Sequence, residues 1–218
     1  MDHSHALPAA HAAHPGHIDT STGLDSRKVA FWIFIGSECL LFGSLIATYM
    51  AYKGRSLTGP FPHEGGWTNR AGEVVEHGVL DIPLTTFSTF ILLMSSVAMV
   101  FALYNVQRGM RKWGTFWLLM TALGGSIFLG CQVFEFTTFY LEGLTPQSNL
   151  FGSTFFVLTG FHGAHVTAGV IYLITLAALS ARGRLGPEKA LNVELAGLYW
   201  HFVDVIWIVI FPLVYLIK

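Results

Sequence analysis

Residues 154–181 of the chain read TFFVLTGFHGAHVTAGVIYLITLAALSA, an apolar run that contains no lysine, arginine, aspartate or glutamate. A helix needs about 20 residues, at 1.5 Å per residue, to cross the roughly 30 Å of hydrocarbon in a bilayer. Four more apolar runs of similar length lie at residues 29–52, 82–104, 113–136 and 195–217. The sequence therefore predicts an all-α, polytopic membrane bundle with five transmembrane helices.

The composition of the whole chain is that of a membrane protein. Of its 218 residues, 53% are hydrophobic and 11% are charged, and the mean hydropathy is +0.56, whereas soluble domains carry about 25% charged residues. A formal net charge of −1 provides no basic surface for nucleic acid, so we expect no nucleic-acid partner. Cys39 and Cys131 both lie in apolar runs and are too few for a disulfide framework.

The chain divides into a tail and one membrane domain. Residues 1–26 contain five of the ten histidines, but neither the basic segment nor the apolar core of a secretory signal. Histidine-rich tracts can bind copper, nickel or zinc, yet the spacing here is irregular and the segment has no apolar cluster to form a core. We predict a disordered N-terminal tail at 1–26 and a five-helix domain at 27–218.

Basic residues in the connections predict the orientation of the bundle. Cytoplasmic loops of membrane proteins are enriched in lysine and arginine. The bundle should therefore have its N-terminus in the cytoplasm and, after five crossings, its C-terminus outside. The side predicted to be cytoplasmic carries Arg27, Lys28, Arg108, Arg111, Lys112, Arg182, Arg184 and Lys189, and the other side carries Lys53, Arg55, Arg70 and Lys218.

Polar residues within or next to the apolar runs need an explanation, because a charge at the bilayer centre costs about 2.5–3.5 kcal/mol. One explanation is metal or haem ligation, since imidazole and carboxylate groups converge readily inside helical bundles. The other is a hydrogen-bonded network that joins the third, fourth and fifth helices. The unequal depths of the histidines favour the network, so we predict no metal site. The network residues are Gln132, Glu135, His162, His165, Glu194, His201 and Asp204.

Asp204 follows His201 by three residues, so it shares a helix face with His201 and is expected to orient the imidazole.

Glu38 lies about ten residues into the first helix, roughly 15 Å deep, and no basic residue shares its helix at that depth. It is either a protonated structural acid or part of a proton path, and the residues leave both readings open.

Two segments resemble subunit III of the haem–copper terminal oxidases. They are GSTFFVLTGFHGAHVTAG at residues 152–169 and ELAGLYWHFVDVIW at residues 194–207. Shorter matches are SE at 37–38, LMSS at 93–96 and QVFE at 132–135. The similarity extends from about residue 27 to residue 217 and is closest to the short, five-helix bacterial form. Longer members have two further N-terminal helices that form a phospholipid-binding cleft.

The resemblance implies a non-redox accessory subunit of a proton-pumping oxidase that oxidises cytochrome c and reduces O2 in the inner (plasma) membrane of a bacterium. It implies direct contact with catalytic subunit I, further contacts with subunits II and IV, and haem and copper centres on those partners only. It also implies contact with membrane lipids, including a bound phospholipid. Glu38 matches the family's intramembrane carboxylate near the proton-uptake side of the catalytic subunit.

Other functions remain as alternatives. Similar chains accompany quinol oxidases and nitric oxide reductases. A further alternative is an independent bis-histidine membrane cytochrome or transporter built around His162, His165 and His201. A haem absorption band from this chain alone would favour that last alternative over an accessory subunit.

Overall fold

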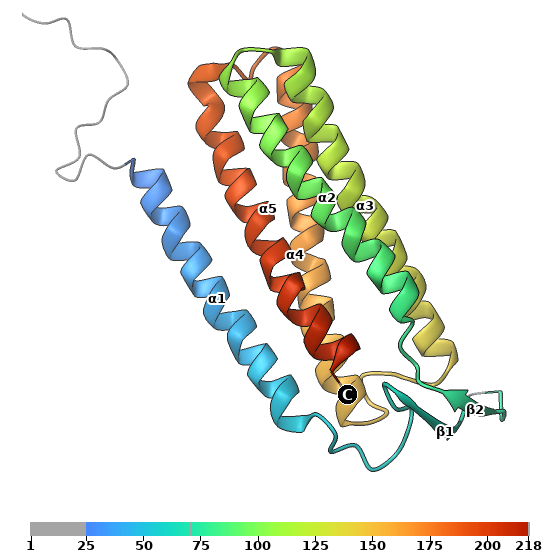
Figure 1. Cartoon of the computed structure of the whole chain (residues 1–218). Helices are drawn as coiled ribbons and strands as arrows, with labels where there is room; N and C mark the ends of the chain where they lie inside the picture. The colour runs from blue at the N-terminus through green and yellow to red at the C-terminus, as the bar shows by residue number, and fades with distance from the viewer. Residues whose placement is uncertain (1–24, 70, 218) are drawn as a thin grey trace, which may run out of the picture.

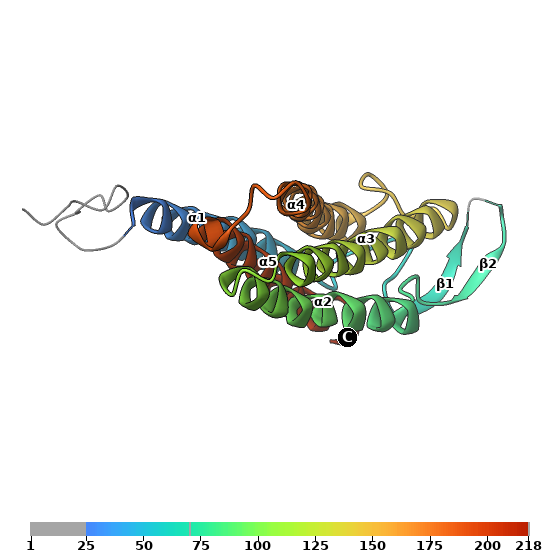
Figure 2. The same cartoon turned by 90° about the horizontal axis from the view of Figure 1, so that it is seen from above.

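The structure is a computed structural model that describes residues 25–69 and 71–217. Its long helices form one bundle, in which α1 lies at the edge against α4 and α5 (Figures 1 and 2). The five helices are long and apolar enough to cross a membrane, which confirms the predicted bundle. The predicted tail lies outside the described residues except at its end. The helices are α1 (Ser26–Tyr52), α2 (Ile82–Gln107), α3 (Arg111–Leu141), α4 (Leu150–Ala181) and α5 (Ala190–Phe211).

Each helix extends beyond the run predicted for it at one end or at both, although α5 itself ends at Phe211, before the predicted end at residue 217. Polar side chains cap the starts of α1 and α4. The Asp25 carboxylate accepts from the Arg27 N–H at 2.8 Å, before α1. The Asn149 side chain accepts from the Gly152 N–H at 2.7 Å, before α4. Hydropathy locates the buried middle of a span, whereas capping side chains locate its ends. At α5, a 3₁₀ turn, η1 (Pro187–Lys189), precedes the helix and a π-helical turn, η2 (Pro212–Leu216), follows it.

Three helices end in the same glycine-closed turn. Gly109 after α2, Gly143 after α3 and Gly183 after α4 have φ angles of 71°, 95° and 75°, a conformation that favours glycine. In the first turn the N–H of Met110 donates to the Asn105 carbonyl at 2.9 Å, and the other two turns repeat this pattern. Each turn thereby satisfies carbonyl groups at the helix end and reverses the chain within a few residues.

The connection between α1 and α2 contains a β-hairpin, which is not among the elements predicted from the sequence. Strands β1 (Glu64–Thr68) and β2 (Val74–His77) pair antiparallel with a bulge in β1. The Asn69 side-chain oxygen accepts from the N–H groups of Ala71 and Glu73, both at 2.9 Å, and so closes the turn between the strands. The hairpin projects from the end of the bundle opposite to the α2–α3 turn (Figure 1).

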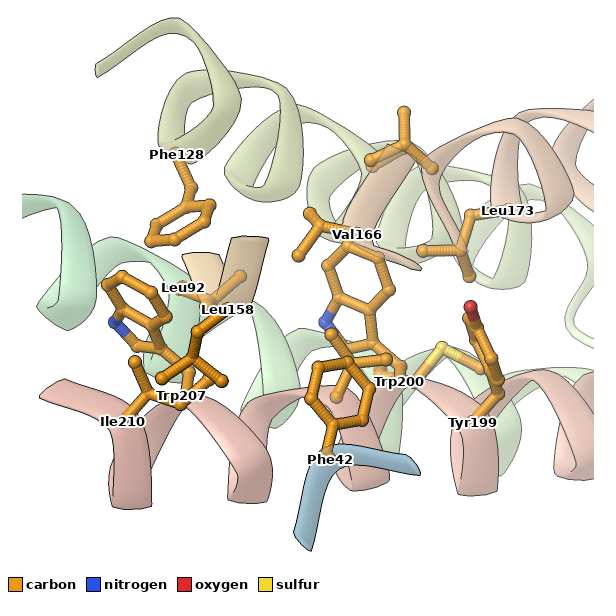
Figure 3. Close-up of a cluster of buried hydrophobic side chains, with 14 of the residues drawn as sticks. Phe42, Leu92, Phe128, Leu158, Val166, Leu173, Tyr199, Trp200, Trp207 and Ile210 are labelled. Carbon is orange, nitrogen blue, oxygen red and sulfur yellow. The ribbon is translucent and has the colours of Figure 1, made fainter. Parts of the chain in front are cut away.

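Two tryptophans of α5 occupy the centre of the bundle. Trp200 and Trp207 are 1% and 2% exposed, and both rise from α5 toward the neighbouring helices in Figure 3. The indole N–H of Trp200 donates to Ser95 Oγ, and that of Trp207 donates to Thr89 Oγ1, both at 2.9 Å. Each tryptophan thus fills the space between helices and satisfies its polar atom on α2.

Glycines on α3 and α4 make room for the Trp200 ring. A Cβ atom at Gly125 would overlap Trp200 Cη2, and one at Gly169 would lie 2.8 Å from Trp200 Cζ3. Gly130, also on α3, has no neighbouring atom within 4 Å of the position that its Cβ would take. Tight helix contact therefore depends on particular glycines.

We expect Gly125→Ala to destabilise the bundle by about 1–3 kcal/mol, because the added methyl group overpacks the Trp200 site. Thermal unfolding in one detergent, followed by circular dichroism, measures the change. Gly130→Ala is the matched control on the same helix and should unfold close to wild type. Equal unfolding of the two variants would contradict the packing described for Trp200.

Candidate functional site

Glu38 of α1 has a histidine partner on α4. Glu38 Oε2 lies 3.0 Å from His165 Nε2, and the two side chains are 15% and 17% exposed. His165 Nδ1 lies 2.8 Å from the Phe161 carbonyl oxygen. Since a carbonyl can only accept, Nδ1 carries a hydrogen, and the contact with Glu38 is completed by one proton on either Nε2 or the carboxyl group. Glu38 and His165 therefore share a single proton position.

Aromatic residues from two helices surround this pair. The ring centroid of Phe42, on α1, lies 5.0 Å from that of His165 in an edge-on arrangement. The Tyr199 hydroxyl of α5 donates to the His165 backbone carbonyl at 3.1 Å. α1 thus contributes the acid, α4 the imidazole and α5 a supporting hydroxyl.

Ser96 of α2 joins the two polar residues of α5. Its Oγ donates to Asp204 Oδ2 and lies 2.9 Å from His201 Nδ1. Because the serine hydrogen is used on Asp204, His201 Nδ1 is the donor to Ser96. Asp204 is 3% exposed and its Oδ1 has no hydrogen-bond partner among the described residues. Asp204 and His201 therefore meet through Ser96, which corrects the expectation that the aspartate orients the histidine directly.

The polar residues of α3 make two separate contacts. Glu135 is 5% exposed and accepts from Thr85 Oγ1 at 2.8 Å and from the Tyr215 hydroxyl at 3.1 Å. Gln132 Nε2 donates to the Thr159 carbonyl of α4 at 2.9 Å. The Glu135 contact joins α2, α3 and η2, and the Gln132 contact joins α3 and α4.

His162 is a packing residue in this structure, although it lies only three positions from His165. It is fully buried, and neither ring nitrogen has a hydrogen-bond partner among the described residues. Its ring stacks on Trp207 at 4.7 Å between centroids and meets the edge of Phe128 at 5.8 Å. The two histidines of α4 thus have different neighbours.

Among the described residues the predicted polar side chains form separate contacts: that of Gln132 joins α3 to α4, whereas the others involve α1, α2 or η2. The first and second helices also supply partners for these polar side chains. Glu194 of α5, for example, pairs with Lys28 of α1 at 2.7 Å. Sequence reasoning missed Ser96, Thr85 and Tyr215 as partners. Ser96 lies in the LMSS segment noted above, whereas no sequence pattern marks the π-helical turn that presents Tyr215.

The residues at 25–69 and 71–217 contain no group of three or more His, Cys, Asp or Glu residues that could hold a metal ion. The polar contacts above are pairs and bridges between helices. Their geometry suits helix association and the exchange of a proton.

Comparison with known proteins identifies the family. The family model for cytochrome c oxidase subunit III matches residues 11–218. The chain belongs to this family. It is 36% identical to the probable quinol oxidase subunit 3 of Staphylococcus haemolyticus, over 91% of this chain and 96% of that one. It is 35% identical to the cytochrome c oxidase subunit 3 of Bacillus sp. strain PS3 (88% and 86%), and 38% identical to the quinol oxidase subunit 3 of Bacillus subtilis (86% and 85%).

Membership of the subunit III family confirms the resemblance noted in the sequence. Subunit III carries no redox cofactor, and the cofactors of the complex lie on partner subunits. The chain is therefore a multi-pass membrane component of a terminal oxidase complex and associates with the other oxidase subunits. This assignment replaces the alternative of an independent bis-histidine cytochrome or transporter.

We expect Ser96→Ala to destabilise the protein by about 1–3 kcal/mol, because it removes the hydrogen bond to a buried carboxyl group. Thermal unfolding of the purified protein in detergent measures the loss. Ser44→Ala is the control, since the Ser44 hydroxyl bonds only to the Leu41 carbonyl of its own helix. If the two variants unfold alike, Ser96 does not join α2 to α5.

Proposed function

We propose that this chain is a non-redox accessory subunit of a proton-pumping haem–copper terminal oxidase, where it stabilises the catalytic subunit and supports proton uptake. The contact between Glu38 Oε2 and His165 Nε2, at 3.0 Å, carries the proposal. A proton can move between these two atoms without either group leaving its partner. The pair can therefore hold an exchangeable proton inside the hydrocarbon layer, where an isolated charge is costly.

The position of the pair supports this role. Glu38 is the thirteenth residue of α1, about 18 Å along the helix from its first residue. Both side chains keep some exposure at the surface of the bundle, whereas Glu135 and Asp204 are 5% and 3% exposed. A proton donor on a neighbouring subunit can therefore reach Glu38 more easily than it can reach the acids of the core.

We propose that the N-terminus faces the cytoplasm and the C-terminus faces outside, in the plasma membrane of a bacterium. The α2–α3 and α4–α5 turns lie together at one end of the bundle (Figure 1), and most basic residues of the connections belong to these turns. The positive-inside rule places that end in the cytoplasm. Proton uptake from the cytoplasm would then begin on the side where α1 starts.

Catalytic subunit I is the proposed direct partner, with subunits II and IV as further contacts. Only Ile35, Phe42 and Tyr49 of α1 are buried within this chain, so most of the helix surface is free to contact another subunit.

The proposed electron donor is cytochrome c. Quinol is the second candidate, because relatives in Staphylococcus haemolyticus and Bacillus subtilis carry quinol oxidase names.

Purification of the tagged chain in mild detergent tests the complex and its donor. We expect a haem–copper catalytic subunit to co-elute, identified by mass spectrometry, and the complex to consume O2. Assays with reduced cytochrome c and with quinol then assign the donor. A chain that elutes alone, or a complex that reduces nitric oxide but not O2, would contradict the proposal.

For Glu38→Gln we expect an assembled oxidase with slower proton uptake at alkaline pH and faster loss of activity during turnover. The effect should be smaller than the roughly 100-fold loss typical of an obligatory proton-transfer group, because the role is one of support. Stopped-flow proton uptake and activity over successive turnovers measure it. Glu194→Gln is the control, since Glu194 pairs with Lys28 at the end of the bundle. Unchanged uptake and lifetime in Glu38→Gln would refute the role of the pair.

A further inference from the structure

Tyr199 of α5 contacts both of the helices that carry the Glu38–His165 pair. Its side chain is largely buried, and Figure 3 shows the ring rising from α5 with the hydroxyl oxygen at its far end. The hydroxyl donates to the His165 carbonyl of α4 at 3.1 Å. The same ring stacks on Phe34 of α1, with centroids 6.4 Å apart and ring planes inclined by 22°. One side chain therefore supports the helix of the acid and the residue of the imidazole.

The aromatic contacts between α1 and α5 lie on both sides of Glu38. Phe34 precedes Glu38 by one helical turn and Phe42 follows it by one turn, so all three share a face of α1. The Phe42 ring lies 6.3 Å from that of Phe202 on α5, edge to face. Because α5 presents Tyr199 and Phe202 to these two rings, it sets the height and the rotation of α1 at Glu38.

The His165 side of the pair is held by the same tyrosine. The contact of His165 Nδ1 with the Phe161 carbonyl stays within α4, so it orients the ring without fixing α4 against its neighbours. A carbonyl oxygen can accept two hydrogen bonds, so the Tyr199 hydroxyl can bond to His165 in addition to the helical N–H. Gly169, one turn further along α4, permits this approach, since a Cβ atom there would lie 3.3 Å from Tyr199 Cε1. Tyr199 therefore fixes α4 at the level of His165.

The Tyr199 hydroxyl does not exchange the proton itself. Among the described residues it bonds to the His165 backbone carbonyl and to neither of the exchanging atoms, Glu38 Oε2 and His165 Nε2. Its contribution to the pair is therefore one of geometry.

The other ionisable side chains on the three helices have contacts of their own. The imidazole on α4 packs against aromatic rings, the ion pair between α1 and α5 lies at the end of the bundle, and the two remaining groups on α5 bond to Ser96 of α2. A change in the pH dependence of the pair can thus be traced to the pair and to Tyr199. These other residues are His162, Lys28, Glu194, His201 and Asp204.

We propose that Tyr199 is a positioning residue that keeps Glu38 Oε2 and His165 Nε2 at the distance needed for proton exchange. Direct exchange needs a heavy-atom distance of about 2.6–3.2 Å, and the pair lies at 3.0 Å. α1 has only three buried side chains, so its own packing holds Glu38 weakly. Small displacements of reacting groups slow a reaction steeply. The inference rests on the role proposed above for the pair in proton uptake.

Tyr199→Phe tests the hydroxyl, because it keeps the ring that stacks on Phe34. In the purified oxidase complex we expect proton uptake at alkaline pH, measured by stopped flow, to be about 3-fold slower, as for the loss of one ordinary hydrogen bond. The pH at which uptake falls to half of its maximum should be lower by about half a unit, since a factor of 3 is half a decade. Phe34→Leu removes the other contact of Tyr199 and should shift the profile in the same direction. Wild-type profiles in both variants would overturn the proposal.

Tyr172→Phe is the matched control. The Tyr172 hydroxyl of α4 donates to the Asn192 carbonyl of α5 at 3.2 Å, so this variant loses the same kind of bond between the same two helices. It should lower the thermal stability as much as Tyr199→Phe does but keep the wild-type pH profile. Equal shifts of the profile in the two variants would overturn the proposal, because they would show a general effect of helix association.

The double variant E38Q/Y199F separates this inference from the proposed function. If Tyr199 acts through the pair, the second substitution should not slow uptake beyond the level of Glu38→Gln. A further 3-fold loss would overturn the positioning role. If Glu38→Gln alone leaves uptake unchanged, the proposed function fails and this inference fails with it. If Glu38→Gln slows uptake whereas Tyr199→Phe and Phe34→Leu do not, only the role of Tyr199 is refuted.

Discussion

Close packing around the two tryptophans of α5 is the interaction on which the rest of the bundle depends. Lipid tails are as apolar as the side chains of the helices, so hydrophobic burial gives little drive for helix association in a bilayer. Close fit between side chains and hydrogen bonds between helices must therefore drive the association. Trp200 lies against Gly125 and Gly169 and donates to Ser95, so one side chain contacts α2, α3 and α4 at once. This one side chain of α5 consequently ties three neighbouring helices together.

The outermost helix is joined to this core in a different way. α1 has few buried side chains, and polar contacts support it at three levels. Lys28 pairs with Glu194 at one end, Glu38 meets His165 in the middle, and Lys53 Nζ donates to two carbonyls beyond α5, Leu213 at 2.9 Å and Ile217 at 2.6 Å. Burial lowers the pKa of Lys53, and the two carbonyls offset part of that cost of burying the ammonium group.

Much of the fold can be predicted from the sequence, because the number of spans follows from the thickness of a bilayer. The partners of the polar side chains cannot be predicted in this way. Glu38 and His165 are 127 positions apart, and hydropathy carries no information about which helices are neighbours. The same limit applies to glycine, since Gly125 and Gly130 differ only in what lies opposite them. The hairpin was missed because its two short strands are set by an asparagine turn and not by an apolar pattern.

His162 and His165 differ in the polar partners that each ring has. His162 is packed against Trp207 and Phe128, and neither of its ring nitrogens has a hydrogen-bond partner among the described residues. His165 lies at the boundary with α1, where packing is looser and an acid is in reach. Proton exchange needs a polar partner and a route to it, and both conflict with close packing. The proposed proton pair therefore belongs at the edge of the bundle, on the helix that the core holds least firmly and that another subunit can cover.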